Sequence, residues 1–214
     1  AAASAAAPPG QGSPPGWREV WLDGSVPGPE SAARGLGESI GRGALVLELA
    51  GVASDAECSS LFHEVHRAHE AALRLGPSIR LGPIGAAGRA RYPTARFGRG
   101  LSEAAEATAE AIFRRVLARV DEELPSLVTE LFATTSASPE SSLVGKLAAG
   151  RFRFAAREPA INLYRRGGRF SSHTDAESLT MLVSLSPRTS FTGGGTGFWH
   201  GEAEGEPVVV LSPP

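Results

Sequence analysis

Cysteine is nearly absent from this chain of 214 residues, because Cys58 is the only one. A single cysteine forms no disulfide within the chain and excludes a zinc site built from several cysteines. No apolar run is long enough to cross a bilayer, so we expect no membrane span. The 21 basic and 23 acidic side chains leave a formal charge of −2, which gives no clear signal for a nucleic-acid partner. The compartment (endoplasmic reticulum or cytoplasm) and the oligomeric state stay open.

Acidic residues are missing from one long stretch, between Glu70 and Glu103. The stretch is rich in glycine and proline, which favours loops with short strands. Two interpretations stay open for its charge: a solvated loop, or a cationic rim for an anionic or polar polymer substrate. The charge comes from six arginines: Arg74, Arg80, Arg89, Arg91, Arg96 and Arg99.

Composition divides the chain into three parts. Residues 1–16 are low-complexity Ala, Pro, Gly and Ser and predict a disordered tail, because they cannot bury enough apolar surface to offset the cost of ordering. Residues 17–43 are punctuated by glycine and proline and predict an irregular lead-in with one short strand at 19–22. Residues 44–214 form one predicted domain, which opens on a buried strand at 44–49.

The first long helix is predicted to start at Ser54. Glu57 follows three residues later and completes a capping box, and the helical pattern runs to about Leu75. Its predicted apolar face consists of Cys58, Leu61, Phe62 and Val65. Three histidines at spacings of three drift around the helix, so we expect a solvated face and no metal site from them. They are His63, His66 and His69.

A second long helix is predicted from Ser102, with two glutamates in its first turns. Pro125 ends it, residues 126–134 are predicted to add a short helix, and the segment 135–150 begins as a loop and ends at a glycine. From Phe152 onward the pattern changes to strands. The two helices are expected to brace one face of a sheet. The helix buries one apolar stripe: Ile112, Phe113, Val116, Leu117, Val120 and Leu124.

His173 and Asp175 are the candidate metal ligands. In a strand, residues two apart point to the same face, so an imidazole and a carboxylate would lie side by side. These are two of the three ligands of the 2-His-1-carboxylate triad, which suits non-haem Fe(II) and leaves coordination positions open. His-x-Asp alone is a weak motif, so the prediction of a metal site depends on the residues around it.

That context resembles a known family. Tyr164-x-x-Gly-x-x-Phe170-x-x-His173-x-Asp175 precedes a predicted strand over 179–185 and the sequence Phe-Thr-Gly-Gly-Gly-Thr-Gly-Phe-Trp over 191–199. This pattern is similar to the core of the prolyl 4-hydroxylase-like Fe(II)/2-oxoglutarate dioxygenases. The resemblance implies an α+β fold with a double-stranded β-helix, or jelly roll, braced by the N-terminal helices.

The resemblance also implies roles for single residues. It makes His173 and Asp175 ligands of Fe(II) and places Tyr164 in the wall of the 2-oxoglutarate pocket. Thr180 and Ser184 would face the barrel lumen, since they alternate with an apolar face of the strand. The three glycines at 193–195 are expected to serve backbone geometry, as a tight turn or bulge.

Two features of the family are expected beyond Pro214. One is the distal histidine that completes the triad, and the other is the Lys or Arg that pairs with the far carboxylate of 2-oxoglutarate. His200 is the only histidine after Asp175 and lies too early for that position. We therefore expect a truncated domain that lacks its last strands, exposes sheet edges and is inactive on its own.

The function implied is oxidation of a substrate C–H bond coupled to conversion of 2-oxoglutarate to succinate and CO2. A peptide or protein substrate is expected, most simply peptidyl proline as in procollagen-proline 4-dioxygenases, with ascorbate keeping the iron reduced. No catalytic residue beyond the metal ligands is expected. Two alternatives stay open: a related oxygenase acting on a nucleobase or small molecule, and a non-catalytic binding protein on the same barrel.

Overall fold

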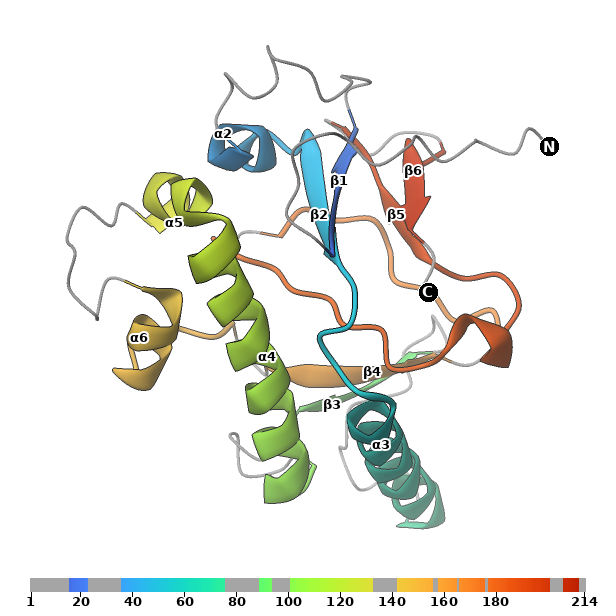
Figure 1. Ribbon diagram of the computed structural model, residues 1–214. Coiled ribbons are helices and arrows are strands. Elements are labelled where there is room, and N and C mark those ends of the chain that lie inside the picture. Colours follow the sequence, from blue (N-terminus) through green and yellow to red (C-terminus); the bar gives the residue numbers. More distant parts are fainter. Residues whose placement is uncertain are drawn as a thin grey trace.

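The fold mixes helices and short strands, which confirms the α+β class (Figure 1). The computed structural model describes residues 16–22, 36–75, 89–93, 101–132, 142–155, 158–164, 166–175, 177–200 and 206–211. The predicted tail therefore lies outside the described residues except for Gly16. Three two-stranded antiparallel sheets form among these residues, and a jelly roll is not shown.

The first sheet pairs β1 (Trp17–Trp21) with β2 (Leu45–Leu49), with Trp17 opposite Leu49. The sequence predicted the bounds of both strands to within two residues. Between them lies α2 (Leu36–Gly41), which contacts β2 and the later helix α5. Within residues 17–43, for which one short strand was predicted, the described part also forms the helix α2.

Helix α3 (Asp55–Leu75) begins as predicted. The Ser54 backbone N–H donates to Glu57 Oε2 at 2.9 Å, and the Glu57 N–H donates to Ser54 Oγ at 3.3 Å, which is the reciprocal pattern of a capping box. Leu61 and Val65 are buried, but Phe62 is 38% exposed, so its predicted place on the apolar face is wrong. Its ring instead lies against His66, with centroids 4.0 Å apart.

Helix α4 (Glu103–Glu123) also begins at its predicted cap, where Ser102 Oγ accepts from the Ala105 N–H at 3.3 Å. The predicted stripe is buried apart from Phe113, which is half-buried. After Leu124 the chain continues into α5 (Pro125–Phe132), which confirms the short helix. Proline is tolerated at this first helical position because its missing N–H would be unpaired anyway.

Helix α6 (Leu143–Ala148) was missed, since its segment was predicted as a loop. Two polar groups make this six-residue helix stable enough to form. Ser142 Oγ accepts from the Gly145 N–H at 2.9 Å. The Asp121 carboxylate of α4 accepts from the Leu143 and Val144 N–H groups at 2.8 and 3.0 Å. A tertiary contact therefore supplies what the short apolar pattern lacked.

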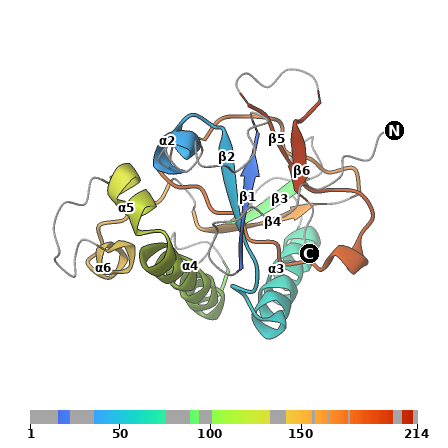
Figure 2. The same ribbon diagram turned by 45° about the horizontal axis from the view of Figure 1, so that its top comes forward.

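Two apolar clusters form the core, and α4 belongs to both. The first joins the C-terminal half of α4 to α5 and α6, and the second joins its N-terminal half to Leu61 and Val65 of α3. Figures 1 and 2 show α3 and α4 as the two long helices on one side of the molecule, beside β3 and β4.

The remaining sheets are small. Strand β3 (Arg89–Pro93) pairs with β4 (Ala160–Tyr164), and β5 (Thr196–Phe198) pairs with β6 (Val209–Leu211). The strand predicted over 179–185 does not form a ladder in the structure. Its alternation is nevertheless real, because Met181 packs on the first cluster while Val183 and Leu185 pack on the second.

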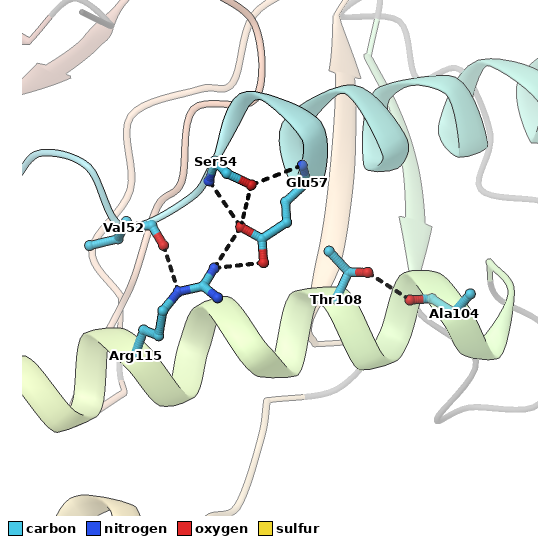
Figure 3. A network of polar contacts seen from close by, with 6 residues as sticks. All are labelled: Val52, Ser54, Glu57, Ala104, Thr108 and Arg115. Atoms are coloured by element: carbon cyan, nitrogen blue, oxygen red, sulfur yellow. Dashed lines mark hydrogen bonds and ion pairs between the residues drawn. The ribbon is translucent and has the colours of Figure 1, made fainter.

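Arg115 joins the two long helices (Figure 3). Its Nη2 lies 2.8 Å from both carboxylate oxygens of Glu57, and its Nε donates to the Val52 carbonyl at 2.9 Å. The Ser54 N–H, followed by Arg115 and the Ser54 hydroxyl, lowers the pKa of Glu57 from 4.5 to about 2. One carboxylate therefore caps α3 and holds it to α4.

This pKa predicts how stability depends on pH. A carboxyl whose pKa is lower in the folded state stabilises the fold fully above its unfolded value of 4.5, and that contribution is lost as pH falls toward about 2. Glu57→Gln should lower the melting temperature at pH 7 and flatten its decline between these pH values. Arg115→Gln should remove only part of the acid dependence, because the Ser54 groups remain. Equal acid slopes in Glu57→Gln and the unmutated protein would contradict this assignment.

The three glycines of the β5 approach all have positive φ, as the prediction of a backbone role requires: +77° at Gly193, +74° at Gly194 and +113° at Gly195. They differ in surroundings. A Cβ at Gly195 would lie 2.8 Å from Val210 Cγ1 and 2.9 Å from the Leu211 carbonyl oxygen, whereas a Cβ at Gly193 meets nothing within 4 Å. The hairpin therefore needs close approach at Gly195 and only a turn at Gly193.

Alanine substitutions should separate these two requirements. Gly193→Ala should cost about 1–2 kcal/mol, the ordinary penalty of a left-handed alanine. Gly195→Ala should cost more, because the new methyl group would displace β6 as well. Chemical denaturation of both variants measures the difference. Equal losses would show that the approach of β6 to Gly195 is not constraining.

Candidate metal centre

The candidate site follows β4. Ile161 and Leu163 face the second apolar cluster, which holds this strand against α3 and α4. Strand β4 ends at Tyr164, and Gly167 (φ +74°) then turns the chain. The turn leads into residues 168–175, which form neither helix nor strand.

His173 and Asp175 meet in the structure. His173 Nε2 lies 3.2 Å from Asp175 Oδ1, and the two side chains are 50% and 46% exposed. The predicted reason was alternation along a strand, but this segment is not a strand. A neighbouring backbone group and an aromatic ring orient the histidine instead.

Two contacts orient the His173 imidazole. Its Nδ1 lies 2.9 Å from the Ser171 carbonyl oxygen. The Phe170 ring lies over it, with centroids 4.5 Å apart and planes inclined at 38°. A histidine that donates one N–H to a backbone carbonyl has its other nitrogen directed outward, which is the arrangement typical of metal-bound histidines. Sequence reasoning placed Phe170 in the motif but did not predict this stacking.

The hydrogen bonding of the pair leaves a position for a cation between the two side chains. A carbonyl oxygen only accepts, so His173 Nδ1 must carry a proton. Asp175 Oδ1, when ionised, also only accepts. A neutral imidazole would therefore turn the lone pair of Nε2 toward another acceptor 3.2 Å away. A proton or a metal ion between the two atoms relieves that repulsion.

The separation of the two atoms also fits a metal ion. Two ligand atoms about 2.1 Å from an octahedral ion, at a right angle to one another, are about 3 Å apart. His173 and Asp175 therefore fit two adjacent positions on one ion. No set of three metal-ligating side chains comes together among the described residues.

The residues predicted to line a co-substrate pocket are solvent-exposed. Tyr164 is 47% exposed, and Thr180 and Ser184 lie on the exposed side of their segment. Ser184 Oγ donates to the Ser186 carbonyl at 3.3 Å. Within the described part of the chain, no hydrogen bond joins Tyr164, Thr180 or Ser184 to the His173–Asp175 pair. Their role in binding stays a prediction.

The other histidines lie elsewhere. His63 and His66 hold their Nδ1 atoms against the Ser59 and Phe62 carbonyl oxygens of their own helix, at 2.7 and 2.9 Å. The prediction of a solvated face is wrong for His69, which is only 8% exposed. His200 is exposed after β5.

Cys58 does not provide a reactive group. Its thiol is half-buried at the start of α3. Burial, followed by the charges of Asp55 and Glu57, raises the pKa of the thiol, so it stays protonated at neutral pH. A protonated thiol is a poor nucleophile and a poor metal ligand.

Comparisons with family models, with curated proteins and with solved structures find no match to this chain. Among the described residues, no helix has the length and apolar character needed to cross a membrane.

The orientation of His173 can be tested by two-dimensional ¹H–¹⁵N NMR of the imidazole in metal-free protein. We expect a protonated Nδ1, with or without a proton on Nε2. Replacing Phe170 with Leu should broaden the ring signals, because the ring loses one of the two contacts that orient it. A neutral tautomer protonated only at Nε2 would rule out the Ser171 hydrogen bond.

Proposed function

We propose that the chain belongs to an Fe(II)- and 2-oxoglutarate-dependent dioxygenase of the prolyl 4-hydroxylase type. The observation that carries the proposal is the His173–Asp175 pair, in which Nε2 and Oδ1 lie 3.2 Å apart at the surface. This pair stands inside the motif from Tyr164 to Trp199 that resembles the family. The favoured substrate is a peptidyl proline.

The residues of the chain would hold and orient the metal ion and contact the co-substrate. His173 Nε2 and Asp175 Oδ1 would hold the metal, and the Ser171 carbonyl would fix the imidazole through Nδ1. Bound Fe(II) with 2-oxoglutarate and oxygen supplies the oxidising power for C–H hydroxylation, and ascorbate keeps the iron reduced. Tyr164, Thr180 and Ser184 would offer hydroxyl groups to the co-substrate.

A double-stranded β-helix is the proposed domain, over residues 44–214. Two observations support it. The order of β4, turn, His-x-Asp, apolar segment and β5–β6 hairpin follows the family pattern. The apolar segment also alternates, because Met181, Val183 and Leu185 face the helices while Leu182 is 67% exposed. Alternation of this kind is what a barrel wall needs.

Metal titration is the direct test. Anaerobic Fe(II), or Co(II) followed by its visible absorption, should bind at one site. His173→Ala and Asp175→Ala should each weaken binding by more than about 100-fold, beyond the loss typical of outer-shell partners. His200→Ala is the matched control and should bind like the unmutated protein. Unchanged affinity in the first two variants would refute the metal centre, and a loss in the third would make His200 a ligand.

Succinate formation separates the candidate functions. A dioxygenase should release succinate when Fe(II), 2-oxoglutarate and ascorbate are combined with a proline-rich peptide and a protein that extends past Pro214 to the expected distal histidine, whereas residues 1–214 alone should release little. An oxygenase for nucleobases or small molecules should do so with those substrates and not with the peptide. Peptide binding without turnover by that longer protein, under conditions in which the metal binds, would favour the non-catalytic alternative.

A further inference from the structure

The turn after β4 presents two arginines to solvent. Strand β4 ends at Tyr164, and the chain turns at Gly167, where φ is +74°. Arg166 lies in this turn and Arg169 follows it, and both residues are exposed. The sequence over 159–174 contains no acidic residue, so this segment carries an excess of positive charge.

The two guanidinium groups have no carboxylate partner, unlike the arginines of β1, α3 and α4. Neither Arg166 nor Arg169 forms an ion pair within the described part of the chain. Their N–H donors are therefore open to acceptors from another molecule. The arginines of β1, α3 and α4 instead form the pairs Arg18–Glu48, Arg67–Glu64, Arg74–Glu70, Arg114–Glu110, Arg115–Glu57 and Arg119–Glu123.

Arg169 lies close to the candidate metal centre. It directly precedes Phe170, whose ring stacks on His173 with centroids 4.5 Å apart. Four residues of chain span at most about 14 Å, which limits the distance between the Cα atoms of Arg169 and His173. An extended peptide covers the same distance in about four residues. A polypeptide held at Arg169 could therefore reach the metal centre with a residue about four positions from the held one.

We propose that Arg166 and Arg169 form a docking surface for an acidic segment of a protein substrate. Guanidinium groups bind carboxylates through paired N–H donors, so two arginines match two aspartate or glutamate side chains. The acidic segment would be held at the turn, with the residue to be oxidised about four positions away. Only the role of the bound protein as a substrate rests on the proposed function; the acidic docking surface does not.

An acidic polypeptide fits this surface better than a nucleic acid. Asp175 and Glu177 follow on the same segment, and both are exposed. A nucleic acid draws most of its affinity from many phosphate contacts along its backbone, so these two carboxylates would repel part of it. A polypeptide can place its carboxylates at the arginines and neutral residues beside Asp175 and Glu177.

Binding of a fluorescent peptide to metal-free protein tests the surface without any catalytic step. The probe is a short Gly-Ser peptide that carries a run of glutamates and no proline, and the reference peptide has glutamine in place of each glutamate. The glutamate peptide should bind more tightly, and added salt should weaken its binding because the contacts are exposed. Arg166→Gln/Arg169→Gln should weaken that binding by roughly five- to tenfold, the loss expected for two exposed ion pairs.

Arg67→Gln/Arg74→Gln is the matched control. It removes the same charge from α3, where both side chains are at least 75% exposed. This variant should bind the glutamate peptide like the unmutated protein. Backbone NMR on the unmutated protein keeps the test independent of variant folding. The peptide should shift the amide signals of residues 166–171 and leave those of α6 in place.

Three outcomes would overturn the proposal. One is equal affinity for the glutamate peptide in the two double variants. Another is equal binding of the glutamate and glutamine peptides, which would leave no role for the carboxylates. The third is tighter binding of a single-stranded oligonucleotide that is also lost in Arg166→Gln/Arg169→Gln.

The docking surface and the dioxygenase can fail separately. Unchanged metal affinity in His173→Ala and Asp175→Ala would refute the dioxygenase, whereas arginine-dependent binding of the proline-free peptide would still support the docking surface. A metal centre that binds as expected, in a protein that does not bind the glutamate peptide, would refute the docking surface alone.

Discussion

Burial of the apolar stripe of α4 is the constraint on which the rest of the structure depends. One end of the stripe packs with α5 and α6, and the other packs with α3 and the inward residues of β4. The sheets are each only two strands wide and cannot form a core alone. The β1–β2 and β3–β4 sheets hold their positions because apolar side chains from β2 and β4 pack on the clusters of this one helix, as do side chains of the 181–185 segment.

That packing determines the position of the candidate metal centre. Ile161 and Leu163 fix β4 before the site, and Val183 and Leu185 fix the chain after it. Between these anchors the His173–Asp175 segment is irregular and exposed, so local contacts must set its geometry. The Ser171 carbonyl and the Phe170 ring do so. A rigid frame with a locally ordered loop is a common way to present ligand-binding groups.

Sequence patterns predicted the parts of the fold that depend on neighbours along the chain. The caps at Ser54 and Ser102, the apolar stripe of α4 and the proximity of His173 to Asp175 are of this kind. The features that sequence patterns did not predict depend on contacts between residues that lie far apart in the sequence. Helix α6 forms because Asp121 meets its first amides, and His69 is buried although its spacing resembled a solvated face. The 179–185 segment has the alternation of a strand without a ladder partner, which periodicity alone cannot reveal.

Because α4 contributes residues to both apolar clusters, the two clusters should unfold cooperatively. A protein with two separate apolar clusters could open one while keeping the other, but here a single helix contributes to both. Unwinding either end of α4 exposes apolar surface at that end and weakens the remaining turns, because helix formation is cooperative. The two clusters should therefore exchange their amide hydrogens as one unit, while the His173–Asp175 loop opens independently at lower free energy. Ligand exchange at the loop then need not disturb the core.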